Sequence, residues 1–325
     1  MKRNENGNFV VGIDLGGTTV TSSVVDREGN LLSEAEIPSY SEKGVDVTTD
    51  KIAESVEEAI KQAGKAREDV IACGMGAPGI HKADEGVVLW SPNFSGWDGA
   101  NVYEPLRKKT GFEFYMGNDV NVASFGEYTF GAGRGAEIMV MFTLGTGVGS
   151  GLIVRGEAYR GMFASPELGH VIIDAKGPRC GCGRYGCVEA LCNRDAIINR
   201  AMQKVLSGRK SKLYEATEGR LTEITPQMID RFANEKDIVC CETLCETGFY
   251  MGLAVANTIN SFDPSLIVIG GGIARSRILF EEIKKTAMET AIDCLKEHCS
   301  IVPSQLGNKA GILGGAALAF KGVYA

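Results

Sequence analysis

Short apolar runs separated by turn residues dominate the start of the chain. Phe9–Asp14, Val20–Asp26 and Leu31–Ile37 are apolar and β-branched, with glycine-containing turns between them, which predicts a meander of three strands. Apolar positions then recur at helical spacing over Asp50–Ala63. Val70–Gly74 predicts a short buried strand, so the order is strand, strand, strand, helix, strand.

The same order of elements returns in the second part of the chain. The apolar runs there predict strands at 138–144, 151–155, 171–174 and 266–269, and helices at 238–261, 280–296 and 314–322. In each copy the first hairpin turn is rich in glycine. We therefore predict two related α/β domains, residues 1–120 and 121–310, with the polar stretch 200–235 as a helical surface insertion.

Composition and charge narrow the class of protein. The 325 residues are 44% hydrophobic and 23% charged, and the net charge of −7 with no basic patch argues against a nucleic-acid partner. The polar first eight residues predict no secretory signal, and we expect no membrane-spanning segment. The ten cysteines are then expected to be reduced, in a cytoplasmic protein. Seven of them show no metal-ligand spacing with a nearby histidine, and we interpret these as small buried side chains or surface thiols. They are Cys73, Cys192, Cys240, Cys241, Cys245, Cys294 and Cys299.

The first glycine-rich turn is Asp14-Leu15-Gly16-Gly17-Thr18, between two predicted strands. Its backbone amides can cradle a phosphate, with Asp14 holding Mg²⁺ and Thr18 donating its hydroxyl. The alternative is a plain hairpin whose glycines adopt positive φ. The spacing is not that of a P-loop, because no lysine follows the glycines.

The second glycine-rich turn is Gly145-Thr146-Gly147-Val148-Gly149. Two such turns at matching places in two matching units can grip a polyphosphate together. The turn is not a dinucleotide fingerprint, because Ser150 occupies the place of the third glycine. Gly270-Gly271-Gly272 ends a predicted strand, and its bare backbone suits either a nucleotide or close packing of helix on strand.

An acidic residue follows the predicted strand Phe112–Met116. Asp119, in Asn118-Asp119-Val120-Asn121, can act as a general base at the end of that strand. The alternative is a helix cap before a predicted helix, Val122–Tyr128. Asn93 lies in a turn-rich loop, 91–97, which is either a ligand-binding loop or a surface turn.

A candidate metal site follows in the second domain. His170, Cys180, Cys182 and Cys187 supply one imidazole and three thiolates, a set that suits tetrahedral Zn²⁺. Four protein ligands leave no open position, so the zinc is expected to be structural. Glu167 and Glu189 flank this zinc group.

These motifs, in this order and spacing, resemble the ROK family of bacterial sugar kinases and repressors. The match leaves out only residues 1–8 and 200–235. The resemblance implies the actin-like, hexokinase-like (ribonuclease H-like) ATPase fold, in which two α/β domains close over a cleft and the last helix, 311–325, joins the first domain. It also implies a homodimer or homotetramer. Repressor members carry an N-terminal winged helix-turn-helix, and the first strand near Phe9 predicts no such domain.

The resemblance also implies roles for individual residues. Asp119 would be the base for the 6-hydroxyl of the sugar, and other hydroxyls would be held by Asn93, Asn118, Glu167, His170 and Glu189. ATP and Mg²⁺ would be bound by Asp14, Gly16, Gly17, Thr18, Thr19, Gly145, Thr146, Gly147, Gly271 and Gly272. Thr19 departs from the lysine or arginine of many members, which puts the affinity for ATP in question.

The expected activity is phosphorylation of a hexose at O6 by ATP, with glucose as the first choice of substrate. An N-acetylhexosamine, such as N-acetylglucosamine or N-acetylmannosamine, is the alternative substrate. Two alternatives are not enzymes: a sugar-sensing regulator that binds without phosphorylating, and an interaction module built on the zinc loop.

Overall fold

The computed structural model describes residues 8–91, 94–162 and 166–324, and it separates into two compact units. The N-terminal unit comprises 1–135, 156–165 and 308–325, and the C-terminal unit comprises 136–155 and 166–307. The N-terminal unit therefore extends past residue 120, where the sequence predicted the boundary. The reason is that helix α3 (Asp119–Phe130) packs against the last helix, α11 (Ala310–Tyr324).

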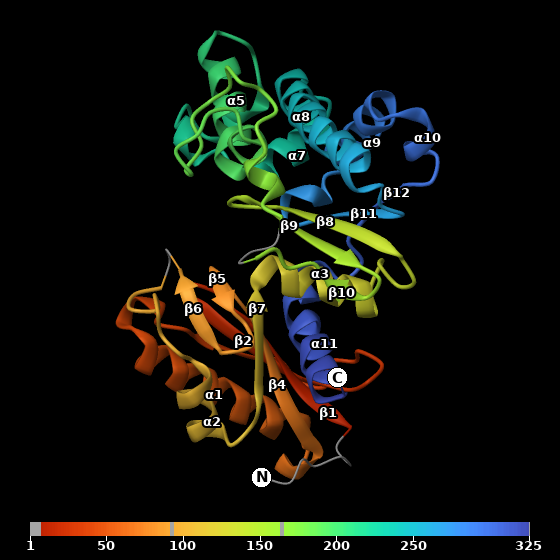
Figure 1. The fold of residues 1–325 in the computed structure, drawn as a ribbon. Helices are drawn as coiled ribbons and strands as arrows, with labels where there is room; N and C mark the ends of the chain where they lie inside the picture. The colour runs from red at the N-terminus through yellow and green to blue at the C-terminus, as the bar shows by residue number, and fades with distance from the viewer. Residues whose placement is uncertain (1–7, 92–93, 163–165, 325) are drawn as a thin grey trace. The chain divides into compact units, whose positions relative to one another are not determined.

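A mixed five-stranded sheet, in the order β3-β2-β1-β4-β7, forms the centre of the N-terminal unit. The first three strands are antiparallel, whereas β4 and β7 run parallel to β1. Helices α1 and α2 cover one face, and α3 and α11 cover the other (Figure 1). The strands and helices are β1 (Phe9–Leu15), β2 (Thr19–Val25), β3 (Ala35–Pro38), α1 (Val45–Ala63), β4 (Val70–Ala77), β5 (Ile80–Lys82), β6 (Val87–Trp90), α2 (Tyr103–Thr110) and β7 (Phe114–Asn118).

The parallel register brings the ends of three strands together. Asp14 pairs with Gly76, and Ala77 pairs with Asn118, so the carboxyl ends of β1, β4 and β7 lie side by side at one end of the sheet. Helix α11 packs closely on the face of the sheet opposite α1 and α2. The packing is close enough that a β-carbon on Gly12 would lie 2.1 Å from the carbonyl oxygen of Ile312. Ligand sites in open α/β sheets usually lie at the carboxyl ends of the parallel strands.

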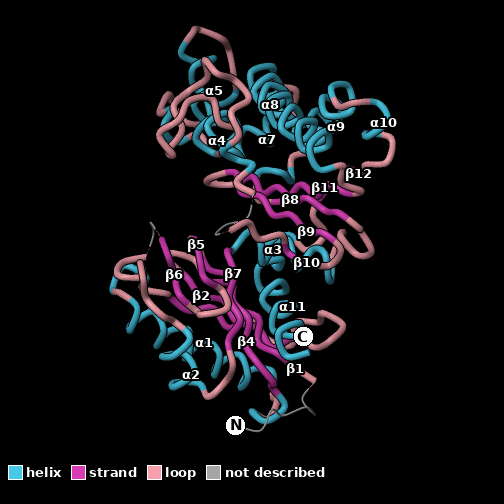
Figure 2. Tube along the Cα trace, viewed as in Figure 1, coloured by secondary structure: helices cyan, strands magenta, loops and turns pink. Residues whose placement is uncertain are grey.

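The C-terminal unit repeats this plan. The strand order β9-β8-β11-β12 corresponds to β2-β1-β4-β7, with an antiparallel hairpin followed by two parallel strands. Figure 2 shows the helices of this unit gathered on one face of the sheet. The elements are β8 (Ile138–Leu144), β9 (Val148–Val154), α4 (Val188–Cys192), α5 (Arg194–Leu206), α6 (Lys212–Ala216), α7 (Pro226–Asn234), α8 (Ile238–Phe262), β11 (Leu266–Gly270), α9 (Arg277–Thr290), α10 (Asp293–Lys296) and β12 (Ser300–Pro303), and the short β10 (Glu157–Ala158) follows β9 in the chain.

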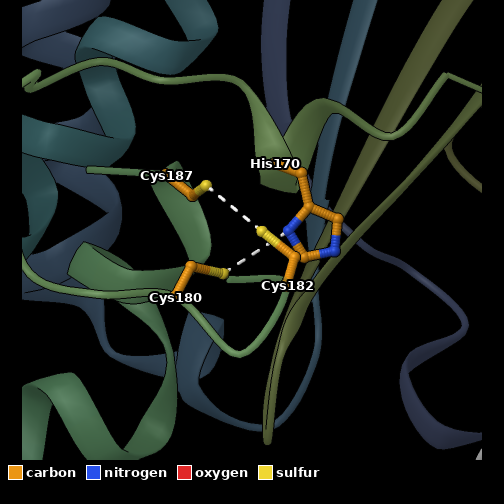
Figure 3. A group of neighbouring side chains, drawn as sticks. All are labelled: His170, Cys180, Cys182 and Cys187. Atoms are coloured by element: carbon orange, nitrogen blue, oxygen red, sulfur yellow. Dashed lines mark hydrogen bonds between the residues drawn. The ribbon is translucent and has the colours of Figure 1, made fainter. Parts of the chain in front are cut away.

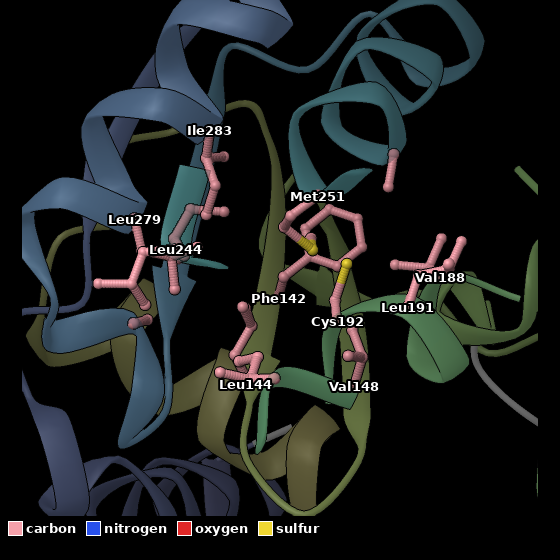
Figure 4. Packing of buried hydrophobic residues seen from close by; sticks show 14 of the residues in the cluster. Phe142, Leu144, Val148, Val188, Leu191, Cys192, Leu244, Met251, Leu279 and Ile283 are labelled. Carbon is pink, nitrogen blue, oxygen red and sulfur yellow. The ribbon is translucent and has the colours of Figure 1, made fainter. Parts of the chain in front are cut away.

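The core of the C-terminal unit lies between the sheet and helices α4, α8 and α9. Phe142 and Leu144 of β8 pack with Leu244 and Met251 of α8 and with Leu279 of α9 (Figure 4). By length and composition α8 is apolar enough to cross a membrane, contrary to the expectation that no segment reaches this limit. However, 56% of its most apolar window is buried inside the protein, because it is the central helix of this core.

Two sequence predictions for the C-terminal unit need correction. Val171–Asp174 forms no strand but a single bridge, between Ile172 and Cys187, because the chain turns there into the loop that carries the three candidate cysteine ligands. Residues 200–235 are helical as predicted, but they are more than a surface insertion. They contribute buried side chains to the core, among them Ala201, Leu213, Ile229 and Phe232.

Candidate functional site

The first part of the candidate site lies where β1, β4 and β7 end in the N-terminal unit. Asp14 is the last residue but one of β1, and Asp119 is the first residue of α3. Burial, followed by the charge of Asp119, raises the pKa of Asp14 to about 6. Burial also raises the pKa of Asp119, although the backbone amide of Val120 donates to its Oδ1 at 2.9 Å. Two carboxylates at one sheet edge can bind a divalent cation and accept a proton.

Asn118 fixes the start of α3, and so fixes Asp119. Its side-chain oxygen accepts from the amides of Val120 (3.0 Å) and Asn121 (3.4 Å), which makes it the N-cap of the helix. Its side-chain nitrogen donates to the carbonyl of Gly79 at 3.1 Å. The helix-cap interpretation therefore describes Asn118. Asn93, the other predicted sugar residue here, lies outside the described residues.

The first glycine turn closes between β1 and β2. The amide of Gly16 donates to the carbonyl of Thr19 at 2.8 Å, and the hydroxyl of Ser41 donates to the carbonyl of Gly17 at 2.6 Å. Neither glycine has a positive φ, so the plain-hairpin explanation does not account for them. Gly17 and Thr18 are exposed, which leaves their backbone open to a ligand.

The carboxylate of Asp14 also lies against the first turn of α11. A β-carbon on Gly311 would lie 2.7 Å from its Cγ and its Oδ2, closer than side chains approach one another. The positive end of a helix favours a negative charge nearby. No sequence motif pointed to Gly311, because about three hundred residues separate it from Asp14.

The second glycine turn lies between β8 and β9 in the C-terminal unit and is held from two sides. The carbonyl of Gly145 accepts from the amide of Arg194 at 2.9 Å, and the amide of Val148 donates to Oε2 of Glu189 at 3.1 Å. Thr146, at its tip, is exposed. A β-carbon on Gly145 would meet no atom within 4 Å, so packing does not require a glycine there.

The third glycine motif follows β11 beside this turn. Gly271 has φ of 92°, and a β-carbon there would lie 2.2 Å from the carbonyl oxygen of Leu144. The close-packing interpretation therefore holds for Gly271. Gly272 is exposed with open space around its α-carbon, which suits an approaching ligand. Gly145–Gly147 and Gly271–Gly272 thus form one patch of bare backbone.

The predicted zinc ligands come together in the same unit. His170, Cys180, Cys182 and Cys187 point toward one another, and their ligand atoms all lie within 4.8 Å (Figure 3). Nδ1 of His170 lies 3.6 Å from Sγ of Cys180, and the Sγ atoms of Cys182 and Cys187 lie 3.7 Å apart. Tetrahedral zinc with bonds of about 2.0–2.3 Å requires such pairs to lie about 3.5–3.8 Å apart. The donor set therefore fits Zn²⁺.

Local structure explains why the four ligands meet. His170 lies in a 3₁₀ turn, Leu168–His170, and Cys187 precedes α4. The amide of Cys180 donates to the carbonyl of Arg184 at 2.7 Å, which closes the loop between the cysteines. The backbone amide of Arg184 lowers the pKa of Cys182 to about 6, which favours the thiolate that a metal requires.

The flanking glutamates differ in their surroundings. Oε1 of Glu189 lies 3.5 Å from Sγ of Cys180 and 4.0 Å from Nδ1 of His170. Glu189 therefore links the four candidate metal ligands to the second glycine turn. Glu167 is exposed, three residues before His170. Nε2 of His170 lies on the side of the ring away from the sulfurs (Figure 3).

Comparisons with known proteins identify the family. The model of the ROK family matches residues 10–321. The chain belongs to the ROK family. Its fold is accordingly the actin-like, hexokinase-like α/β fold, in agreement with the duplicated sheets.

The individual relatives include kinases and regulators. A glucokinase of Halalkalibacterium halodurans is 31% identical over 94% of this chain and 93% of its own length. The structure of a Streptomyces griseus ROK family glucokinase in complex with glucose and AMPPNP matches with a TM-score of 0.82 and 30% identity, covering 96% of this chain and 99% of the other. A xylose repressor of Bacillus subtilis is 26% identical over 96% of this chain but 77% of its own length.

Proposed function

We propose that this protein transfers the γ-phosphoryl group of ATP to the 6-hydroxyl of a hexose, with glucose as the preferred substrate. The general activity, that of an ATP-dependent sugar kinase, is supported by glucokinases that match nearly the whole chain at about 30% identity. The observation that supports the chemistry is the pair of carboxylates, Asp14 and Asp119, at the ends of neighbouring parallel strands.

Asp119 is the general base of the proposed reaction. Its half-buried carboxylate has a raised pKa, so it accepts a proton more readily than an exposed aspartate does. The cap formed by Asn118 holds it at the start of α3. Phosphoryl transfer needs positioning and charge stabilisation more than covalent chemistry, so a fixed base is the principal requirement from this unit.

Asp14 and the glycine turns bind MgATP in this proposal. Asp14 holds Mg²⁺, which when bound neutralises charge on the phosphates. The backbone of Gly16, Gly17, Thr18 and Thr19 in one unit, and of Gly145, Thr146, Gly147, Gly271 and Gly272 in the other, supplies amides for ATP. Thr19 uses its carbonyl to close the first turn and brings no positive charge.

The sugar-binding residues of the C-terminal unit are Glu167, His170 and Glu189, with Asn118 and Asn93 from the other unit. Zinc, held by His170 and the three cysteines, is structural, and it fixes the tautomer and orientation of the imidazole when bound. The free Nε2 of His170 is then presented to a sugar hydroxyl. A site built from such polar groups rejects sugars that leave one of them unpaired.

The decisive experiment is a coupled assay of ADP formation with MgATP over glucose, mannose, fructose, N-acetylglucosamine, N-acetylmannosamine and xylose. We expect the highest kcat/KM with glucose. A higher value with an N-acetylhexosamine would overturn the hexose assignment while keeping the kinase. Sugar binding by calorimetry without any turnover would instead support the regulator that the similarity to the xylose repressor suggests.

We also propose that the protein is cytoplasmic and assembles as a homodimer or homotetramer. All ten cysteines are free, which suits a reducing compartment. Multi-angle light scattering distinguishes the two assemblies from a monomer. Fractionation of cells followed by immunoblotting tests the location.

A further inference from the structure

A buried serine connects the phosphate turn of the C-terminal unit to its sugar-binding residues. Ser150, the third residue of β9, is only 7% exposed. Its hydroxyl donates to the carbonyl of Pro166 at 2.6 Å and accepts from the amide of Leu168 at 3.0 Å. These two partners are the residues on either side of Glu167. One hydroxyl therefore fixes the backbone both before and after that glutamate.

The start of β9 also contacts Glu189 and Gly169, the residue before His170. A β-carbon on Gly169 would lie 1.9 Å from the carbonyl oxygen of Val148, so the backbone beside His170 lies directly on the strand. The amide of Val148 donates to Glu189 at 3.1 Å. Val148 and Ser150 thus contact Glu189, the backbone on both sides of Glu167, and the residue before His170. The strand begins directly after Gly147, at the end of the second glycine turn.

We propose that Ser150 is a positioning residue for sugar recognition, which aligns Glu167 and His170 with the phosphate turn. The inference rests on the proposed function, because it assigns a sugar to these residues. Ser150 is assigned this role through its backbone partners, Pro166 and Leu168, and not through contact with a substrate. A tetrahedral hydroxyl that serves as donor and acceptor at once determines the separation of Pro166 and Leu168, which alanine cannot do.

The test is Ser150→Ala in the full-length, zinc-loaded protein. We expect KM for the preferred sugar to rise about tenfold or more, because two buried hydrogen bonds are lost. We expect kcat and KM for ATP to change by about twofold or less, because the glycine turn and Asp119 are untouched. Zinc content should stay at the wild-type level. Hydrogen exchange of the Leu168 amide should accelerate about tenfold or more, since this amide loses its acceptor.

The matched control is Thr258→Val in α8. Thr258 is 4% exposed, and its hydroxyl donates to the carbonyl of Ala254 at 2.8 Å, so the variant also removes a buried hydroxyl from this unit. It should lower the melting temperature without changing KM for sugar. The same small change of KM in both variants, or an unchanged exchange rate at Leu168, would overturn the positioning role. Absence of sugar phosphorylation by the wild-type protein would refute the proposed function, and the exchange measurement would still decide whether Ser150 holds the segment.

Discussion

Replacing Asp14 by asparagine should stabilise the N-terminal unit while it abolishes activity. Asp14 is half-buried at the end of β1, against the first turn of α11. Burial and then the charge of Asp119 disfavour its ionised form. A buried carboxylate that binds a cation lowers the stability of the folded protein when that cation is absent. Asparagine has the same shape and removes the charge.

The magnitude follows from the pKa of Asp14, which rises from 3.8 to about 6 in the folded protein. Each unit of pKa corresponds to about 1.4 kcal/mol, so the ionised carboxylate lowers the free energy of unfolding by about 3 kcal/mol. The raised pKa means that stability is retained below pH 3.8 and lost as the pH rises through 6. Asp14→Asn should therefore gain about 3 kcal/mol at pH 7.5 and about 1 kcal/mol at pH 4.5.

The assay is urea unfolding followed by tryptophan fluorescence in buffer without magnesium. Both tryptophans, Trp90 and Trp97, lie in the N-terminal unit, and Trp97 is 1% exposed. The signal therefore reports the unit that contains Asp14 and not the C-terminal unit. Adding Mg²⁺ should raise the stability of the wild-type protein but not that of the variant.

Asp84→Asn is the matched control. Asp84 has a side chain that is 99% exposed, so its replacement should change the free energy of unfolding by no more than about 0.5 kcal/mol. The reasoning fails if Asp14→Asn is no more stable than the wild type at pH 7.5. It also fails if the gain in stability is the same at pH 4.5, because a difference independent of pH cannot arise from ionisation.

Three further substitutions test other parts of the proposed site. Asp119→Asn should leave glucose affinity within a few-fold by calorimetry and lower kcat by about 10²–10⁴, the loss expected for a general base; a near-normal kcat would remove Asp119 from that role. Cys182→Ser should lose zinc by metal analysis and raise KM for sugar, whereas Cys294→Ser, at an exposed thiol, should keep both at wild-type values; absence of zinc from the wild-type protein would end this idea. Gly311→Ala should lower kcat about 10–10²-fold, because its β-carbon would lie 2.7 Å from the carboxylate of Asp14, with glucose affinity unchanged; normal turnover would mean that α11 does not fix this carboxylate.

Local patterns predicted most of the secondary structure. Ile138–Leu144 is a strand with the predicted bounds, and α8 begins at the predicted Ile238. The exceptions are segments whose structure depends on distant contacts. Val171–Asp174 has the apolar composition of a strand, but the cysteine-containing loop that follows it offers a single bridging residue instead of a partner strand. The stretch 200–235 has enough polar residues to suggest a surface, yet its apolar minority faces the core.

The sequence by itself determined the duplicated α/β plan, the glycine turns, the four candidate metal ligands and the acidic residue after β7. Hydrophobic periodicity, glycine and short-range spacing carry that information. Only the tertiary structure brought Gly311 to Asp14 and Ser150 to both sides of Glu167. The first contact arises from the packing of the last helix against β1, and the second from a loop that folds back onto β9, and no local sequence pattern specifies either. The fold also joins the candidate metal site to β9 and the second glycine turn, through the contacts of Glu189 and Ser150.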